Sequence, residues 1–438
     1  MSASWNYRYR FAAYLRSELW VIPFVAIGLE LLIAPVVEFI DARLAWRGIS
    51  LGLSGAQAMS GTVTTLALSF TVFTFGSILV AIQVASGQYT PRVIATTLLR
   101  DNVIRFTAGL FVFTLLFAIR AQNRVEDSVA QFVAVIVGLL GFASLVAFLY
   151  LIDYAARMLR PVSLIKKISE KGLGVIQSIY PQPFDSEQEL AGPMPSPNPV
   201  DRTVLHQGSS AIVLAVNLPR LVGEARKRNG VIEFVPQVGD FVGGDEPLFL
   251  LHGGAVNIDE KILRESVAFG SERTINQDPM FAVRVLVDIA IKALSKAIND
   301  PTTAVLAIDQ LQRLLRGAGR RSLRSERVLD DSGQVRVIFR TPGWEDFVHL
   351  ACCEIRFYGT ENIQIARRLR AMLTTLSDTL PAERRPALLK ELDLLDRMAV
   401  ALYKLPEDLA LARIPDSQGL GGSMAPALPY PAPPEVPK

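Results

Sequence analysis

A glutamate stands inside the first long apolar stretch of the sequence. Glu30 lies near the middle of a mostly apolar segment, about 19–40. A carboxylate at that depth in a membrane is costly unless it is protonated or paired, and intramembrane acids mark ion and proton paths. Three interpretations stay open: a protonated glutamate bonded to a neighbouring helix, a residue on an ion or proton path, or a shifted span that leaves Glu30 near an interface.

The second apolar stretch, about 56–84, carries a stripe of small hydroxyl side chains. Its members are Ser60, Thr64, Thr71 and Thr74. At 100° per residue these positions fall within about 80° of one another around a helix. One interpretation is close helix packing, with hydroxyls bonding to a neighbour or back to a carbonyl. The other is a water-exposed face of a pore or cavity.

Polar residues crowd the end of this second stretch, where Gln88, Tyr89 and Arg92 lie within five positions. A helix stop with Tyr89 and Arg92 as interfacial anchors accounts for them. The alternative is a constriction, or a coupling loop that contacts the soluble domain.

Two Asp-Pro pairs begin helices in the second half of the chain. Asp278 and Asp300 each precede a proline, which is the pattern of an N-cap acid followed by proline at the first helical position. Asn299 and Asp300 are also candidate cation ligands, although capping explains both. With Arg273, these residues form a candidate coupling or ligand region.

Four apolar stretches position the first group of residues. They run over about 19–40, 56–84, 103–121 and 129–152. Each reaches the roughly 20 residues that a helix needs to cross a bilayer. Eleven Lys and Arg residues flank one side of these spans and four flank the other. Because basic residues collect in cytoplasmic flanks, we expect both termini of the chain in the cytoplasm.

Composition narrows the functional class. The 438 residues are 50% hydrophobic and 20% charged, which excludes a purely soluble enzyme and a disordered chain. The net charge of +3 is too small to indicate nucleic acid as a partner. The two cysteines, Cys352 and Cys353, are adjacent, which excludes a disulfide scaffold and indicates free thiols in a reducing compartment.

The sequence therefore predicts an integral membrane α-helical bundle of four transmembrane helices plus a cytoplasmic α+β domain. The predicted boundaries are 1–152 for the transmembrane domain, 153–200 for an amphipathic helix and Pro-rich linker, 201–411 for the α+β domain and 412–438 for a disordered Pro-rich tail. Within the α+β domain, the small β-rich part covers 203–251 and the helical part 272–411.

Two long blocks of this sequence, 69–93 and 272–304, resemble the bacterial family of predicted membrane proteins called domain of unknown function 2254. The likeness extends over roughly residues 15–410. It implies a protein of the bacterial cytoplasmic (inner) membrane with a cytoplasmic domain. It supplies no accepted activity and no catalytic residues.

No nucleotide-binding, zinc-protease or paired Cys-x-x-Cys motif is present in the sequence. We therefore expect no enzyme, no cofactor and no metal site. The leading hypothesis is a homo-oligomeric channel or transporter that lies in the lipid bilayer and carries a cytoplasmic regulatory domain. The alternative is a membrane-anchored sensor or scaffold whose cytoplasmic domain binds a ligand or a protein partner.

Overall fold

The chain divides into two compact units. Ala12–Leu164 form the membrane unit, and Ile165–Lys438 with Met1–Phe11 form the soluble unit. The computed structural model describes residues 5–6, 8–9, 15, 18–44, 52–88, 101–124, 131–158, 160–185, 199–323 and 327–422.

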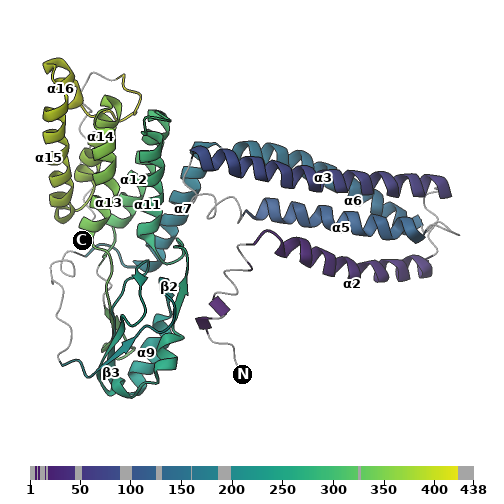
Figure 1. Cartoon of the computed structure of the whole chain (residues 1–438), viewed down its shortest axis with the longest axis horizontal. Helices are drawn as coiled ribbons and strands as arrows, with labels where there is room; N and C mark the ends of the chain where they lie inside the picture. The colour runs from purple at the N-terminus through teal and green to yellow at the C-terminus, as the bar shows by residue number, and fades with distance from the viewer. Residues whose placement is uncertain are drawn as a thin grey trace, which may run out of the picture. The chain divides into compact units, whose positions relative to one another are not determined.

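Four long apolar helices make up the described part of the membrane unit. They are α2 (Val21–Leu44), α3 (Leu53–Gln88), α5 (Asn102–Arg124) and α6 (Gln131–Met158). All four are long and apolar enough to cross a membrane. They lie side by side as one bundle (Figure 1). This arrangement confirms the predicted membrane bundle.

Small residues and aromatic rings hold these helices together. Half of the apolar window of α5 is buried, against 22% for α2, so α5 is the central helix. A Cβ on Gly141 of α6 would lie 2.6 Å from Val63 Cγ2 of α3, which shows that the two backbones approach closely. Phe70 of α3 stacks on Phe148 of α6 with ring centroids 4.2 Å apart. In lipid the hydrophobic effect does not drive helices together, so close van der Waals packing holds this bundle together.

Two small sheets form the β part of the soluble unit. Its strands are β1 (Arg202–Leu205), β2 (Ala211–Val216), β3 (Gly230–Phe234), β4 (Phe241–Val242), β5 (Pro247–Gly253), β6 (Val267–Gly270), β7 (Arg327–Leu329) and β8 (Val335–Phe339). The first sheet has the order β1-β5-β3-β8-β7 and the second β4-β2-β6. In the first sheet, β3 and β8 pair in parallel, so the helical segments between them in sequence form the crossover.

Helices account for most of the rest of this unit. They are α7 (Pro161–Ile179), α9 (Leu218–Lys227), α10 (Glu260–Arg264), α11 (Pro279–Ala293), α12 (Pro301–Gly319), α13 (Trp344–Gly359), α14 (Ile363–Thr379), α15 (Arg385–Leu402) and α16 (Pro406–Ala412), with 3₁₀ turns at Gly254–Asn257 and Ala382–Arg384. Figure 1 shows α11 to α16 gathered at one end of the unit and the sheets at the other. The helices and sheets together confirm the predicted α+β class.

The amphipathic helix predicted after the fourth span differs in extent from the structure. α6 continues to Met158, and a new helix, α7, begins at Pro161. The apolar face of α7 packs on α11 and α12, because a Cβ on Gly172 would come within 2.6 Å of Ala282 and 3.3 Å of Leu314. Most of α7 thus belongs to the soluble unit. Much of the predicted Pro-rich linker, 186–198, lies outside the described residues.

The structure also describes residues 412–422, which the sequence analysis assigned to a disordered tail. Asp416 is fully buried, and its carboxylate accepts backbone hydrogen bonds from Gln418, Gly419 and Gly421 at 3.1, 3.0 and 2.6 Å. Arg367 of α14 donates to the carbonyl of Gly421 at 3.0 Å. These bonds order the segment although its composition does not predict it. Residues 423–438 lie outside the described residues.

Candidate functional site

Three carboxylates lie along the face of α2 that turns toward α5. Glu30, Glu38 and Asp41 are separated by eight and three positions, spacings that place them on one side of a helix. Ala34 fills the turn between the first two and is buried. The face of α2 that packs into the bundle therefore carries three acids.

Glu30 is the most enclosed of these acids. Only 3% of its surface is exposed, and its Oε1 has no hydrogen-bond partner among the described residues. A charge at the centre of a membrane helix costs about 2.5–3.5 kcal/mol on insertion scales. An unpaired charge is therefore unfavourable at this position, which makes Glu30 a candidate functional residue.

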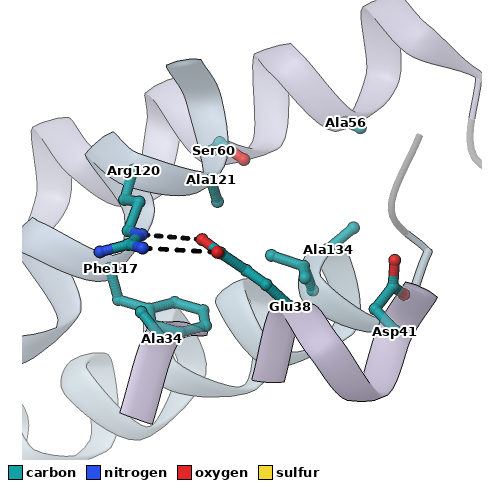
Figure 2. Close-up of a pocket in the computed structure, with 10 residues that line it drawn as sticks. Ala34, Glu38, Asp41, Ala56, Ser60, Phe117, Arg120, Ala121 and Ala134 are labelled. Carbon is teal, nitrogen blue, oxygen red and sulfur yellow. Dashed lines mark hydrogen bonds and ion pairs between the residues drawn. The ribbon is translucent and has the colours of Figure 1, made fainter. Parts of the chain in front are cut away.

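Glu38 is paired with an arginine from α5. The Arg120 Nε donates to Glu38 Oε1 at 2.7 Å, and Nη2 donates to Oε2 at 3.4 Å. Figure 2 shows the two groups facing each other across the gap between the helices. A fork of this kind fixes both side chains and neutralises the buried acid.

Asp41, unlike Glu38, binds a backbone N–H group. Its Oδ1 accepts a hydrogen bond from the backbone N–H of Phe132 at 2.9 Å, at the first turn of α6. A carboxylate is favourable there because the unpaired N–H groups of a helix start carry partial positive charge. Asp41 therefore ties the end of α2 to the beginning of α6.

A small cavity of about 50 Å³ lies between these groups. Its lining consists of Ala34, Glu38, Asp41, Ala56, Ser60, Phe117, Arg120, Ala121, Val133 and Ala134 (Figure 2). One water needs at least about 10–15 Å³ of such space. The cavity therefore has room for a few waters next to a carboxylate, a guanidinium and a hydroxyl, at the end of the bundle away from Met158.

The structure separates the members of the predicted hydroxyl stripe. Ser60 is buried and lines the cavity beside Glu38. Thr64 and Thr71 are half-buried and donate to carbonyls of their own helix, Ser60 O and Ala67 O, both at 2.8 Å. Thr74 is buried, and its Oγ1 has no partner among the described residues. It lines a second, largely apolar cavity of about 200 Å³. Within one copy of the chain the stripe therefore does not line a single path, and its role as a pore face stays a prediction.

The predicted coupling loop lies mostly outside the described residues. Gln88 is the last residue of α3, and its side chain is not described. Tyr89 and Arg92 fall in the undescribed segment 89–100. The constriction and coupling hypotheses for this loop stay predictions.

The two predicted caps are confirmed. Asp278 Oδ1 accepts from the N–H of Phe281 at 2.9 Å at the start of α11. Asp300 Oδ1 accepts from the N–H of Thr303 at 3.1 Å at the start of α12. Burial raises the pKa of Asp278 to about 6, while the Phe281 hydrogen bond opposes that shift.

These caps stand far apart. Asp300 follows the end of α11 and Asp278 precedes its start, so a helix of 15 residues, about 22 Å long, separates them. Arg273 lies near Asp278, because its Cζ would be 3.5 Å from a Cβ on Gly239, which itself would touch Asp278 Oδ2. Asn299 has a φ of 48° and forms the turn before Asp300. Among the described residues, no cluster of three or more His, Cys, Asp or Glu side chains is placed to hold a metal.

The model of the family described as "Predicted membrane protein (DUF2254)" matches residues 16–375, which is most of the chain. The chain belongs to this family. The match confirms the resemblance seen in the sequence and the assignment to the membrane.

Proteins that resemble the chain include uncharacterized proteins of Mycobacterium tuberculosis and Mycobacterium bovis. Each is 26% identical over 424 residues, covering 93% of this chain and 81% of the relative. Both organisms are bacteria. No solved structure matches the chain.

Sequence reasoning passed over Glu38, Asp41 and Arg120. Each lies near the end of an apolar stretch, where charged residues are ordinary interfacial features. The signal that distinguishes them is spacing, since Glu38 and Asp41 continue the helical face of Glu30. Arg120 carries no comparable signal, because its partner Glu38 is 82 positions away in sequence.

Proposed function

We propose that this family member is a proton-conducting channel or transporter of the bacterial cytoplasmic membrane, built from several copies of the chain and regulated by its soluble unit. The observation that carries the proposal is Glu30, a buried acid inside the membrane bundle with an oxygen that has no partner among the described residues. Such a carboxyl can take up and release a proton without first breaking a salt bridge. The proposal includes no enzymatic step.

The cavity at Glu38, on the same face of α2 as Glu30, favours protons over larger ions. The cavity beside Glu38 holds a few waters, which is too little room for a hydrated metal ion. Waters, hydroxyls and carboxyls can pass a proton along hydrogen bonds, whereas a sodium or potassium ion needs a continuous shell of oxygen ligands.

Several copies are needed because one bundle is small. Four spans are few for a transporter with its site at the membrane midplane. Helices α2 and α3 bury only 22% of their apolar windows within one copy. Their free faces can contact lipid or further copies around an axis.

The proposed orientation places both termini in the cytoplasm. Basic residues concentrate on the side of the bundle where α6 ends, and Arg157 lies in its last turn. The cavity with Glu38 and Arg120 is at the other end, so in this orientation it faces the outer side of the membrane. Protons from the outer side would then approach Glu30 from the end of the bundle where this cavity lies.

Proton flux into proteoliposomes tests the proposal. Purified full-length protein is reconstituted with a pH-sensitive dye inside, and a potassium gradient with valinomycin supplies the driving force. We expect wild-type flux above that of empty liposomes, and loss of most of it in Glu30→Gln. Asp153→Asn is the matched control, because Asp153 is an exposed acid near the end of α6. Wild-type liposomes that acidify no faster than empty ones would contradict the proposal, as would full flux in Glu30→Gln.

A second candidate function, a membrane-anchored sensor, is favoured by one observation. The soluble unit contains a cavity of about 590 Å³, larger than the two cavities of about 50 and 200 Å³ described in the membrane unit. A sensor needs a ligand site and an anchor but no proton path. The flux measurement separates the two functions, since a sensor gives no flux with or without Glu30.

A further inference from the structure

The large cavity of the soluble unit has the dimensions of a ligand site. Its volume is about 590 Å³, within the 300–1,000 Å³ of pockets that hold small organic molecules. The ends of α7, α9 and α11 that meet there enclose it together with strands β3, β7 and β8. Elements from distant parts of the sequence thus converge on one hollow, as they do at binding sites.

One part of the wall is apolar and stiff. Phe234 of β3 and Phe339 of β8 are direct neighbours in the sheet, and both line the cavity. Four prolines add to the lining: Pro181, Pro219, Pro279 and Pro342. Proline has a fixed φ and no N–H, so this wall holds its shape and presents carbon surface rather than donors. Such a surface suits a flat aromatic ring.

Another part of the wall is basic. Arg327 at the start of β7 and Arg340 directly after β8 both line the cavity. Arg327 lies opposite Ile338 in the sheet, so the two arginines flank the same end of it. Neither guanidinium has an ion-pair or hydrogen-bond partner in the described part of the chain. Two arginines without acids favour a phosphate, which accepts paired N–H bonds from guanidinium groups.

The third part of the wall is an acceptor. The buried carboxylate of Asp278 lines the cavity, with Oδ1 held by Phe281 and Oδ2 against Gly239. The phenol of Tyr180, also buried, lies beside it, with its hydroxyl 3.5 Å from the carbonyl of Pro342. A carboxylate in such a position accepts hydrogen bonds from the hydroxyls of a sugar.

We propose that this cavity binds a nucleoside phosphate, with the phosphate on Arg327 and Arg340, a ribose hydroxyl on Asp278, and the base against the wall of phenylalanines and prolines. An inorganic phosphate would use only the basic part of the lining, and an apolar molecule only the stiff part. A nucleoside phosphate uses all three parts at once. The site goes beyond the proton path of the membrane unit and does not depend on it.

Binding to the full-length protein in detergent tests the site. Calorimetric titration with the four common nucleoside 5′-monophosphates identifies the tightest, which is then compared with its nucleoside and with inorganic phosphate. We expect the monophosphate to bind at least tenfold more tightly than its nucleoside and at least tenfold more tightly than inorganic phosphate. In Arg327→Ala/Arg340→Ala, its affinity should fall at least tenfold, to that of the nucleoside.

Arg226→Ala is the control for the arginine variant. Arg226 is an exposed arginine of the same unit, paired with Asp331, and it does not line the cavity. Its variant should bind like the wild type. If the double variant fails to fold by circular dichroism, the single variant at the exposed Arg340 takes its place. The site is overturned if no monophosphate binds, if the nucleoside binds as tightly as its monophosphate, or if the arginine variant keeps wild-type affinity.

Discussion

The pair formed by Glu38 and Arg120 joins α2 and α5 through two hydrogen bonds. The Glu38 side chain is 12% exposed and that of Arg120 is 36% exposed, so water screens the pair only on one side. Removing one partner of an enclosed pair leaves an uncompensated charge, whereas removing both does not. Loss of one partner therefore destabilises the bundle, because the charge of the other partner is left unpaired in the membrane.

A double-mutant cycle measures this contact. We expect Arg120→Gln to destabilise the bundle by about 1–2 kcal/mol, because Glu38 is then left unpaired. Glu38→Gln/Arg120→Gln should recover much of that loss. The free energy of unfolding of each variant is measured for the full chain in mixed micelles as the fraction of a denaturing detergent is increased. A double variant whose loss equals the sum of the two single losses would show that the two groups do not interact.

The raised pKa of Asp278 predicts that the stability of the folded protein depends on pH. Its pKa in the folded protein, about 6, is above the ordinary value of 3.8, so the folded state binds the proton more tightly than the unfolded state does. Its contribution to stability is therefore present below about pH 4 and is lost as the pH rises to about 6. Asp278→Asn keeps an N-cap acceptor but carries no charge.

We expect Asp278→Asn to be more stable than the wild type above pH 6, by about 1–3 kcal/mol, and equal to it near pH 4. Scanning calorimetry of both proteins across this range checks the expectation. The opposite order, with the wild type more stable at pH 7, would mean that the ionised carboxylate is favoured by its surroundings.

At the scale of elements, the bundle depends on the close approach of α3 and α6. Gly141 has no room for a side chain beside Val63, whereas a Cβ on Gly76 of α3 meets nothing within 4 Å. The same substitution at the two glycines therefore separates a packed helix face from an open one.

We expect Gly141→Leu to push α3 and α6 apart and destabilise the bundle by at least about 1–3 kcal/mol, the range for overpacking. Gly76→Leu should be tolerated within about 0.5 kcal/mol. Thermal unfolding of the detergent-solubilised variants compares them. Equal losses at both glycines would indicate that the free face of α3 is itself packed, as in an assembly of copies.

The helices and their starts could largely be predicted from the sequence, because they depend on residues that are close together in the chain. The spans follow from the length of apolar runs, and the helix starts at Pro279 and Pro301 from the Asp-Pro pairs. The pairing of Glu38 with Arg120 could not be predicted, since it depends on which faces of α2 and α5 meet. The order of residues 412–422 could not be predicted either, since it depends on the buried Arg367 donating to Ile414 and Gly421.

For the molecule as a whole, the direction in which the chain crosses the membrane decides which side the cavity of Glu38 and Arg120 faces. A reporter that is active only in the cytoplasm should be active when fused after Lys438. The same reporter inserted between α2 and α3, at residue 48, should be silent, because the few basic residues there favour the outer side. Activity at residue 48 together with silence after Lys438 would reverse the orientation and place the cavity of Glu38 and Arg120 on the cytoplasmic side.

Infrared spectroscopy of the reconstituted full-length protein shows whether Glu30 holds an exchangeable proton inside the bundle. We predict a protonated-carboxyl band near neutral pH that is missing from Glu30→Gln, remains in Asp153→Asn and shifts when the sample is moved from H₂O to D₂O. The shift would mean that water reaches the carboxyl. Identical carboxyl spectra for the wild type and Glu30→Gln, or a Glu30 band that D₂O leaves unchanged, would contradict the presence of an exchangeable proton at Glu30.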